Sequence, residues 1–434
     1  MNPHSETDRQ TAEAAPTILP RAGHPISRTL IDEPTLKVLY RLKQSGYKAY
    51  LVGGSVRDLL LGLQPKDFDV GTDATPEQVR RLFRNGMLVG RRFRLAHIRF
   101  GGDQVVEVAT FRRHPLPEEF PEDPADHAFF VQNQFGTPRE DAFRRDFTIN
   151  ALFYDIASFA VIDHVGGLAD LAARRLRVIG DPLVRFTEDP VRMLRALEFA
   201  ARLGFALDEP AREAIYARAP LIAEAAPARL RDELVTLFRY GVGSPVLRRA
   251  QAMGLLAPML AGYEADEPTF ALLEQIDQLA SSQRQVDEGQ LIAALFLSRF
   301  WRNCPPERER PIGEVLELAG LLLAPYGNQF RIAHGLRHQA RELLVGCYRL
   351  GRGPGRRGER RFLRHPATPA ALELFRLWQQ VRGAEMELCK QWEAALVRQQ
   401  TTAPDQEAAA ESAGDRPARR RRRRPRRRQR PPRT

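Results

Sequence analysis

The sequence predicts an α+β multidomain protein in which a mixed head is followed by an all-helical neck and body, with disordered termini. Apolar runs of strand length alternate with helical segments over residues 34–172, a pattern typical of strands and helices packed in layers. From about residue 173 onward the apolar spacing is helical throughout. Both ends of the chain are polar, and the C-terminal end is a run of arginine.

These changes in pattern divide the chain into five expected segments. A disordered lead-in covers 1–33, the head covers 34–172, a helical neck covers 173–240, a helical body covers 241–395, and a disordered Arg-rich tail covers 396–434. With 434 residues, of which 43% are hydrophobic, the chain is long enough to build more than one core.

The head begins with a strand, a turn, a helix and a second strand. KAYLV (48–52) is a short apolar run that ends at Gly53-Gly54, and SVRDLLLG (55–62) has helical spacing. DFDVGT (67–72) is the second expected strand.

A further helix and a hairpin complete the head. Thr75-Pro76-Glu77-Gln78 is a capping box with proline at the first helical position, which predicts a helix to about Asn85. LAHIRF (95–100) and QVVEVATF (104–111) flank a Gly-Gly-Asp turn and predict a β-hairpin. The next segment, 112–138, holds five prolines and no periodicity, which is typical of a functional or disordered loop.

Composition excludes several classes of protein. No stretch approaches the roughly 18 consecutive apolar residues of a membrane-spanning helix, and the polar N-terminus lacks the apolar core of a secretory signal. The three cysteines, Cys304, Cys347 and Cys389, are far apart, which argues against a disulfide framework or a Cys-built zinc site. We therefore expect a cytoplasmic protein.

The net charge of +12 lies entirely in the tail. Residues 416–434 contain 12 of the 66 Lys and Arg residues and no acid, so the rest of the chain holds 54 basic and 54 acidic residues. A run of like charge is commonly a solvated, disordered segment. It also has the chemistry to tether RNA through its phosphates or to bind an anionic membrane surface, and charge alone leaves these alternatives open.

Asp67 and Asp69 form the candidate metal site. Side chains alternate along a strand, so on the expected strand both carboxylates point to one face and Phe68 points to the other. Two neighbouring carboxylates repel each other unless a cation lies between them, and Mg²⁺ prefers oxygen ligands of this kind. A solvated strand edge with two acids is the alternative, which a lone Asp-x-Asp pattern favours.

The Gly53-Gly54 turn shifts the balance toward a metal site. Glycines between a strand and a helix let backbone amides approach a phosphate, and the start of a helix favours an anion; Arg57 lies in the same helix. A phosphate-binding turn followed within about fifteen residues by Asp-x-Asp is more specific than either pattern alone. Together they predict a site for a metal ion and a nucleoside triphosphate.

Two acids are candidates to complete a two-metal site, in which ions about 3.5–4 Å apart stabilise the attacking and leaving oxygens. Glu107 lies on the expected strand 104–111, and Asp146 lies in RRDFTIN beside Arg144 and Arg145. An exposed strand acid and a surface ion pair are the respective alternatives, and sequence spacing does not rank the two acids.

A second polar cluster, EDPVRMLR (188–195), opens a helix in the neck. Arg192 and Arg195 are three residues apart on one helix face, and Asp189 precedes the helix. A guanidinium and a carboxylate offer donors and acceptors on the scale of a base edge. The cluster predicts base and phosphate recognition, with a helix cap and solvated arginines as the alternative.

Motifs found in series indicate a family. LVGGSVRDLLLG, KDFDV, RRDFTINAL and GDPLVRFTEDPVRMLRALEFAARLGF, in this order, resemble the class II nucleotidyltransferases of the DNA polymerase β superfamily. That group includes bacterial poly(A) polymerases and CCA-adding tRNA nucleotidyltransferases. The resemblance covers about 48–240 and implies a polymerase-β-like catalytic head, a neck that binds nucleotide and RNA, and a body that binds RNA.

The resemblance also implies roles for the candidate acids. Asp67 and Asp69 become the catalytic pair that holds two Mg²⁺ ions, and Asp146 becomes the third active-site acid, ranked above Glu107. The nucleotide-binding residues that it implies are Gly53, Gly54, Arg57, Arg145, Asp189, Arg192 and Arg195. Among these, Asp189 and Arg192 match the pair that reads the base.

One segment favours a subgroup. VGRRFRLAH (89–97) and the Arg-rich tail resemble bacterial poly(A) polymerases, and the chain lacks the His-Asp dipeptide of the hydrolase domain that many CCA-adding enzymes carry. The implied activity is template-independent polyadenylation of RNA 3′ ends with ATP and Mg²⁺, which releases pyrophosphate and promotes RNA decay. CCA addition to tRNA and a non-enzymatic RNA-binding role are the alternatives. The implied partners are RNA-decay machinery, an RNA chaperone and, through the tail, a membrane surface.

Overall fold

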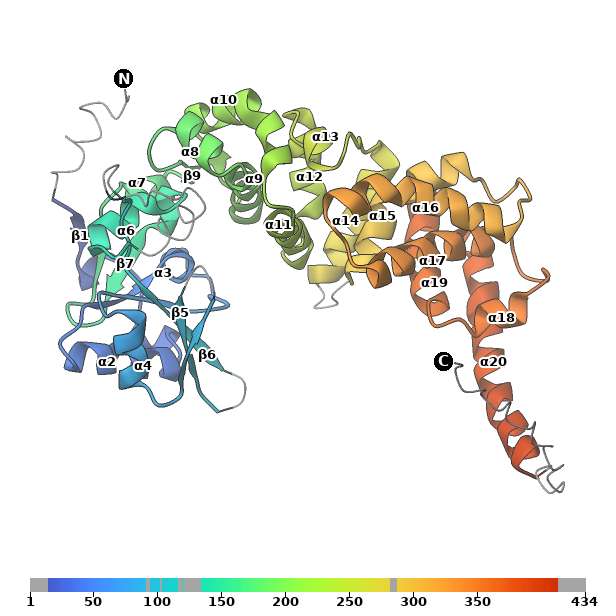
Figure 1. Ribbon diagram of the computed structural model, residues 1–434, viewed down its shortest axis with the longest axis horizontal. Helices are drawn as coiled ribbons and strands as arrows, with labels where there is room; N and C mark the ends of the chain where they lie inside the picture. The colour runs from blue at the N-terminus through green and yellow to red at the C-terminus, as the bar shows by residue number, and fades with distance from the viewer. Residues whose placement is uncertain are drawn as a thin grey trace, which may run out of the picture. The chain divides into compact units, whose positions relative to one another are not determined.

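The computed structural model describes residues 15–90, 94–101, 104–115, 119, 134–281 and 287–412 (Figure 1). The chain forms two compact units. The first runs to Glu288 and includes Ala324–Ala333, and the second consists of Gly289–Leu323 and the residues from His334 onward. The expected head and neck therefore belong to one compact unit. Within the described ranges, no helix combines the length and apolarity needed to cross a bilayer.

A mixed sheet organises the head and confirms its α+β class. Among the described residues, eight strands pair in the order β1-β8-β7-β2-β3-β6-β5-β4. They are β1 (Thr17–Leu19), β2 (Ala49–Val52), β3 (Asp69–Thr72), β4 (Gly86–Val89), β5 (Leu95–Arg99), β6 (Val105–Thr110), β7 (Leu152–Asp155) and β8 (Ala160–Asp163). Neighbouring strands are antiparallel except β3 and β6, which run parallel.

Two helices pack on this sheet. α2 (Glu33–Gln44) follows the lead-in, and α4 (Pro76–Leu82) follows β3. The predicted capping box is confirmed at α4: Thr75 Oγ1 accepts a hydrogen bond from Gln78 N–H, and the Gln78 side chain accepts one from Thr75 N–H. The helix ends at Leu82, three residues before the expected Asn85.

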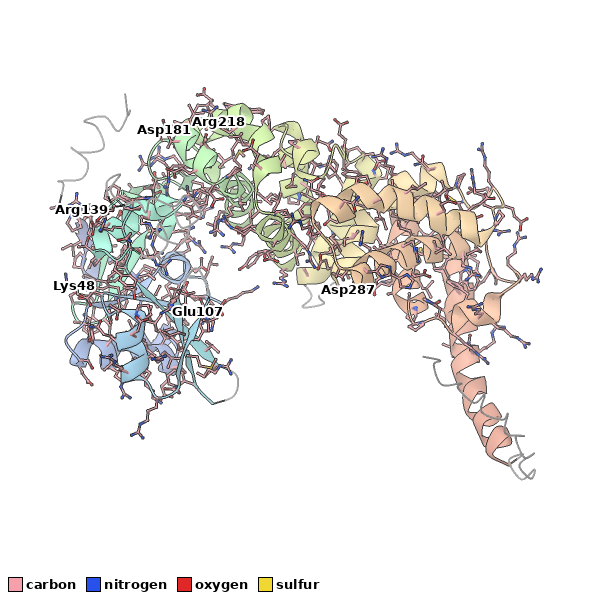
Figure 2. All side chains as sticks on the ribbon, in the orientation of Figure 1. Lys48, Glu107, Arg139, Asp181, Arg218 and Asp287 are labelled. Carbon is pink, nitrogen blue, oxygen red and sulfur yellow. The ribbon has the colours of Figure 1, made fainter. Side chains whose placement is uncertain are left out.

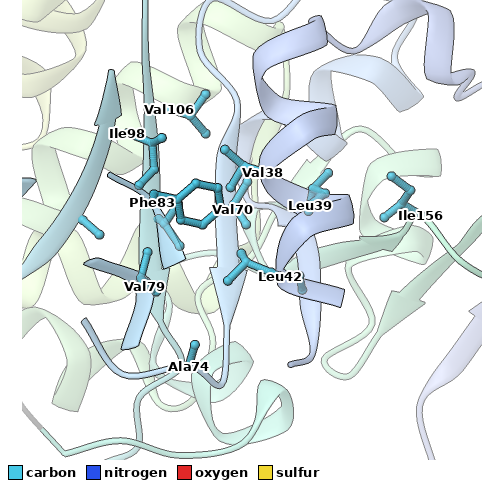
Figure 3. Packing of buried hydrophobic residues seen from close by; sticks show 13 residues of the cluster. Val38, Leu39, Leu42, Val70, Ala74, Val79, Phe83, Ile98, Val106 and Ile156 are labelled. Carbon is cyan, nitrogen blue, oxygen red and sulfur yellow. The ribbon is translucent and has the colours of Figure 1, made fainter. Parts of the chain in front are cut away.

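The main core of the head lies between these helices and the sheet. Val38 and Leu42 of α2 are fully buried with Val70 of β3, together with Ile98 of β5 and Phe83, which follows α4 (Figure 3). Burial of such side chains stabilises the head by roughly 1.5–3 kcal/mol each. This core therefore fixes β3, the strand that carries Asp69, against the helices.

The predicted hairpin is confirmed, and it places three polar side chains in a row. β5 and β6 are antiparallel with His97 opposite Glu107. β6 and β3 are parallel with Glu107 opposite Asp69, and Figure 2 labels Glu107. Because directly paired residues share one face of a sheet, His97, Glu107 and Asp69 are neighbours across three strands.

The expected strand over 67–72 begins later than predicted. β3 starts at Asp69, so Asp67 precedes the strand instead of alternating with Asp69 along it. The reason is that Val52, the last residue of β2, pairs with Asp69, and the chain then turns away at Gly53. Residues before Asp69 therefore have no β2 partner. Phe68 is buried, as expected.

The lead-in over 1–33 was expected to be disordered, and its described part is ordered. β1 pairs with β8, and two short 3-10 helices follow, η1 (Arg21–Gly23) and η2 (Arg28–Leu30). Ile26 is fully buried. The partner strand is far away in the sequence, so local composition did not reveal this pairing. Residues 1–14 lie outside the described residues, as does most of the 112–138 loop.

Helices make up most of the remaining first unit. They are α3 (Gly54–Leu60), α6 (Pro138–Arg144), η4 (Thr148–Asn150), α7 (Gly167–Ala172), α8 (Pro182–Glu188), α9 (Val191–Leu203), α10 (Glu209–Arg218), η5 (Ala219–Glu224), α11 (Pro227–Arg239), α12 (Gly243–Ala252), α13 (Leu256–Met259) and α14 (Glu267–Ser281). A short parallel pair, β9 (Arg175–Leu176) and β10 (Ala206–Leu207), interrupts the expected all-helical region. Backbone N–H groups of Ala206 and Asp208 donate to the carbonyls of Arg174 and Leu176 and hold it together.

The described part of the second unit is helical, as predicted. Its helices, two of which share residues with the first unit, are α15 (Glu288–Asn303), α16 (Ile312–Gln329), α17 (His334–Gly351), α18 (Glu359–Leu363), α19 (Thr368–Val381) and α20 (Glu387–Ser412). α20 continues to Ser412, so helix extends into the stretch from residue 396 that was expected to be disordered; this stretch is rich in Ala, Glu and Gln, which favour helix. The Arg run at 416–434 lies outside the described residues.

Candidate active site

One pocket of the first unit, with a volume of about 810 Å³, gathers the predicted site residues. The head contributes the glycine turn, the Asp67–Asp69 segment and the RRDFTIN segment, and the neck contributes α9 and α11. All ten residues predicted from the sequence line it: Gly53, Gly54, Arg57, Asp67, Asp69, Arg145, Asp146, Asp189, Arg192 and Arg195. Glu107 is not part of the lining.

The two neck helices each turn one polar face to the pocket. On α11, the lining residues Arg229, Glu233 and Thr236 recur every three to four residues, with Tyr240 just after the helix end. Such spacing places side chains on one side of a helix. The other side, with Leu230, Leu234 and Leu237, is buried. α9 follows the same rule, so the apolar core sets which face meets the pocket.

The glycine turn is shaped by the arginines that approach it. Gly53 has φ 74°, a left-handed conformation that glycine adopts without strain. A Cβ on Gly53 would lie 3.0 Å from Nη1 of Arg145, and a Cβ on Gly54 would lie 3.4 Å from Nη2 of Arg57. A side chain at position 53 would therefore crowd the Arg145 guanidinium group, whereas a Cβ at position 54 would only touch that of Arg57.

Asn150 holds both guanidinium groups at the turn. Arg57 is 2% exposed, and its Nη1 donates to Asn150 Oδ1 at 2.5 Å while its Nε donates to Asp58 Oδ1 at 2.8 Å. Arg145 Nη1 donates to the Asn150 backbone carbonyl at 3.2 Å, and its Nη2 donates to Asp141 Oδ2 at 2.9 Å. Asn150 was not among the predicted site residues, although it lies in the RRDFTIN motif.

Asp67 and Asp69 have no ion pair or side-chain hydrogen bond within the described part of the chain. Water reaches the Asp69 carboxylate, yet the surrounding protein desolvates it. This desolvation, reinforced by the negative charges of Glu107 and Asp67 and opposed by Arg145, raises the pKa of Asp69 to about 6. Unpaired, mutually repelling carboxylates fit a hard divalent cation such as Mg²⁺.

Glu107 lies between Asp69 and His97 in the sheet, and its carboxylate contacts His97. Its Oε1 is 3.2 Å from Nε2 of His97, and its side chain is 48% exposed. In the described ranges, no three His, Cys, Asp or Glu side chains converge closely enough to hold a metal ion. Among the acids that line the pocket in the described ranges, Asp67 and Asp69 are those left unpaired and open to a metal ion.

Asp146 lines the pocket with its carboxylate already paired. Arg195 donates to Asp146 Oδ2 from Nη2 at 2.8 Å and from Nε at 3.0 Å, and it donates from Nη1 to Glu233 Oε1 at 3.0 Å. Burial alone would raise the pKa of Asp146, but the charge and hydrogen bonds of Arg195, with those from Asn150 and the Phe147 N–H, hold it below its ordinary value. Asp146 thus links the head to α9 and α11.

Asp189 and Arg192, the predicted base-reading pair, form hydrogen bonds to other residues and not to each other. Asp189 accepts two hydrogen bonds from Arg229, at 2.8 and 3.1 Å. Arg192 Nη1 donates to the carbonyl of Arg185 at 3.1 Å and to Glu188 Oε2 at 3.3 Å. Arg229 was missed because its partner is forty residues away in the sequence, and nothing local marks it.

The aromatic rings of Phe199 and Tyr240, on the neck side of the pocket, are in contact with cationic side chains. The guanidinium carbons of Arg57, Arg195 and Arg202 lie 5.2, 5.4 and 4.8 Å from the ring centroid of Phe199. Arg202 also lies 4.2 Å from the ring centroid of Tyr240, and Lys66 Nζ lies 4.3 Å from it. Helical spacing from Arg192 and Arg195 was the signal that could have found Phe199 and Arg202.

Family models match three parts of the chain. The model described as the poly A polymerase head domain matches residues 49–177. The model described as a probable RNA and SrmB-binding site of polymerase A matches 204–266. The polymerase A arginine-rich C-terminus matches 322–428. The matched head and the matched C-terminus fit the predicted order of segments.

Relatives and solved structures agree with these models. Poly(A) polymerase I of Salmonella typhi is 40% identical over 93% of this chain and 90% of its own length, and that of Haemophilus influenzae is 38% identical over 89% and 90%. The CCA-adding enzyme of Bacillus pumilus is 39% identical over only 48% of this chain and 51% of its own. The crystal structure of the Bacillus stearothermophilus CCA-adding enzyme in complex with CTP matches with a TM-score of 0.62 and 27% identity, covering 86% of this chain and 84% of that one.

The extent of these matches separates the subgroups. CCA-adding enzymes share the fold, and the Bacillus pumilus enzyme aligns with about half of the chain. The poly(A) polymerases align over nearly all of it. The chain therefore belongs to the bacterial poly(A) polymerase family.

Proposed function

We propose that this protein extends RNA 3′ ends with AMP units from ATP, without a template and with Mg²⁺, and releases pyrophosphate. The observation that carries the proposal is the content of one pocket: an unpaired carboxylate pair, an arginine-flanked glycine turn and the Asp189–Arg192 segment. Relatives named poly(A) polymerase I support RNA and ATP as the substrates.

Asp67 and Asp69 are the proposed metal-binding and catalytic acids. Bound as two ions, Mg²⁺ would supply Lewis-acid charge that lowers the pKa of the RNA 3′-OH and neutralises the triphosphate. The carboxylates fix where this charge lies, so that the 3′ oxygen meets the α-phosphate in line with the departing pyrophosphate. Asp146, which we predicted as a third catalytic acid, would act here by fixing Arg195.

Gly53, Gly54, Arg57 and Arg145 are the proposed triphosphate site. Both guanidinium groups lie at the turn and are held by Asn150. Planar guanidinium groups suit phosphate oxygens because they donate several hydrogen bonds in a fixed geometry. Since Asn150 fixes them before substrate arrives, little side-chain freedom is lost when the triphosphate binds.

Asp189 and Arg192 are the proposed adenine-reading pair, with Arg195 assisting. Arg229, which also lines the pocket, donates to both oxygens of the Asp189 carboxylate, and each oxygen keeps a further lone pair for an exocyclic amine. A pocket of this kind discriminates because a wrong base leaves its polar groups unpaired.

An extension assay tests the activity. Purified protein and Mg²⁺ are incubated with a generic single-stranded RNA and, separately, with a tRNA that lacks its CCA end. Each NTP is offered alone, and ATP is also offered with CTP. We expect a long ladder on the generic RNA with ATP alone. Growth limited to the tRNA and dependent on both CTP and ATP would establish CCA addition instead.

Specific partners and the cellular location are proposed from membership of the family. We expect the protein to act in the bacterial cytoplasm with RNA-decay machinery and an RNA chaperone, and the Arg-rich tail to contact RNA or an anionic membrane surface. Each phosphate that the tail neutralises adds about 0.7 to the salt slope of single-strand binding. Deletion of 416–434 should therefore weaken RNA binding and flatten its salt dependence, and unchanged binding would exclude the RNA role.

A further inference from the structure

We propose that Tyr240, Lys66 and Arg202 form the subsite for the 3′-terminal nucleotide of the RNA acceptor. The Tyr240 ring stacks on the terminal base, and the two cations bind the adjacent phosphate. This inference rests on the proposed transfer of AMP to RNA and names where the acceptor lies.

Tyr240 is an exposed aromatic ring in the lining of a polar pocket. It follows the last residue of α11 and is 36% exposed. Lys66 Nζ and Arg202 Cζ lie 4.3 and 4.2 Å from its ring centroid. A ring that keeps this exposure contributes little to the core, whereas its flat face suits any nucleobase.

The two cations at this ring are held differently. Arg202 forms an ion pair with Glu198 at 3.1 Å, in which both side chains are largely buried. Lys66 has no carboxylate within ion-pair distance among the residues that the structure describes. Its ammonium group rests on the ring alone, so it can move aside when a base stacks there and bind the phosphate instead.

The location fits the acceptor better than the donor nucleotide. Lys66 directly precedes Asp67, so a nucleotide held here presents its 3′-OH beside the catalytic carboxylates. The proposed triphosphate residues lie around the glycine turn, and the Phe199 ring contacts both Arg57 of that group and Arg202 of the acceptor subsite. The two substrates would thus meet in one pocket at the same acids.

The chemistry also matches what an untemplated polymerase needs. The enzyme must accept whichever nucleotide ends the RNA, so its acceptor subsite has to bind without reading base edges. Stacking on an aromatic ring is tolerant of sequence because every base has a π face, and nearby cations neutralise the backbone.

The test uses the full-length protein and a short single-stranded RNA whose terminal 3′ base is 2-aminopurine, whose fluorescence falls when it stacks. The same RNA with the probe at its 5′ end is the control for position. Variants are Tyr240→Leu, Tyr240→Phe and Lys66→Ala. Tyr216→Leu is the matched control, because Tyr216 is 56% exposed on α10 and lies outside the pocket lining.

We expect binding of the 3′ probe to quench its fluorescence in the parent protein, in Tyr240→Phe and in Tyr216→Leu. Tyr240→Leu should lose the quenching and weaken RNA binding by roughly five- to a hundredfold, the range for a base stacked on an aromatic ring. It should raise KM for RNA and leave KM for ATP unchanged. Lys66→Ala should lower the salt slope of RNA binding by about 0.7.

Unchanged quenching and unchanged KM for RNA in Tyr240→Leu would overturn the subsite. A rise in KM for ATP instead would assign the ring to the donor nucleotide and would also overturn it. Thermal unfolding shows whether Tyr240→Leu is folded, and the salt slope of Lys66→Ala tests the subsite independently. Because the binding arm uses no ATP, it distinguishes failure of the subsite from failure of the proposed polymerase activity.

Discussion

The two walls of the pocket differ in whether all of their acidic side chains are paired. On the neck wall, Asp189, Glu198 and Glu233 are each paired with an arginine. On the head wall, Asp67 and Asp69 have no cationic partner among the described residues, although the other two acids of that wall are paired. Both walls border the same cavity, so the difference is not one of solvent access alone.

This contrast distinguishes acids that stabilise the structure of the pocket from acids that are available to bind a cation. An acid that is paired with arginine stabilises the position of both side chains, and its loss leaves a cation without its partner. Two acids that repel each other hold positions that only a cation relieves. Substitutions on the two walls should therefore differ in whether they affect stability or turnover.

The largest effect is expected on the head wall. Asp69→Asn should lower the extension rate by roughly a thousandfold or more, because metal-ion and electrostatic stabilisation of this kind supplies several kcal/mol. Its thermal unfolding temperature should stay the same or rise, because a like-charge repulsion is removed. Glu33→Gln, which affects an exposed acid of the head that is paired with Lys37 outside the pocket lining, is the control and should keep the parent rate. Near-native extension by Asp69→Asn would remove it from the metal site.

The next effect concerns the pair that joins the walls. Asp146→Asn removes one of the two carboxylates that pair with Arg195 in a largely buried site and leaves only Glu233, so we expect unfolding to become easier by about 2 kcal/mol. The urea midpoint of unfolding measures this loss. Glu209→Gln, in an exposed pair with Arg212, should change the same midpoint very little. Equal stability of the two variants would contradict the contrast.

The pH dependence of metal binding gives a smaller and graded effect. The pKa of Asp69 near 6 lies above its ordinary value of 3.8, so below pH 6 a metal ion must displace a proton. Apparent metal affinity should fall by about tenfold per unit of pH below that value and be flat above it. Calorimetric titration with Mn²⁺ at several pH values measures this slope, and Asp69→Asn should abolish it.

The raised pKa of Asp69 affects folding stability in the opposite direction from metal affinity. Because the folded, metal-free protein holds this proton more tightly than the unfolded chain does, its stability should fall as pH rises from about 4 to about 6. In the presence of bound metal the trend should disappear. A metal-free stability that rises across this window, relative to Asp69→Asn, would contradict the raised pKa.

The smallest effect on folding is expected at the outer neck wall. The Arg229 side chain is 57% exposed in its pair with Asp189, and exposed pairs contribute about 0–1 kcal/mol. Arg229→Ala should therefore unfold almost as the parent does. It should nevertheless raise KM for ATP relative to CTP, because Asp189 loses the group that orients it. Unchanged nucleotide preference in steady-state assays would limit Arg229 to a structural role.

Local patterns predicted the parts of the site that depend on neighbours in the sequence. The Thr75 capping box, the hairpin and the glycine turn each need only a few consecutive residues, and the structure contains all three. Asp67 and Asp69 both line the pocket, but the predicted alternation of the two along one strand was wrong because β3 begins only at Asp69. That boundary is set by where β2 ends, which the DFDVGT pattern does not contain.

Pairing between distant residues escaped prediction. Asp146 binds Arg195, Asp189 binds Arg229, and β1 pairs with β8. Each depends on where the chain returns in three dimensions. For the same reason Asn150 was overlooked, because its role follows from Arg57 and Arg145 meeting around it.

The balance of fixed charge in the pocket has a consequence for how substrates arrive. The lining holds seven Lys or Arg side chains and seven Asp or Glu side chains, so at a distance their fields largely cancel and a free nucleotide is not steered inward. The association rate of ATP should therefore be nearly insensitive to ionic strength. Its phosphates are attracted to the pocket arginines only at short range, where a phosphate takes the place of a carboxylate beside an arginine. The excess charge of the chain lies in 416–434. A long polyanion would be attracted to those arginines, which are far from the pocket residues in the sequence, while the mononucleotide would reach the pocket by diffusion without electrostatic attraction.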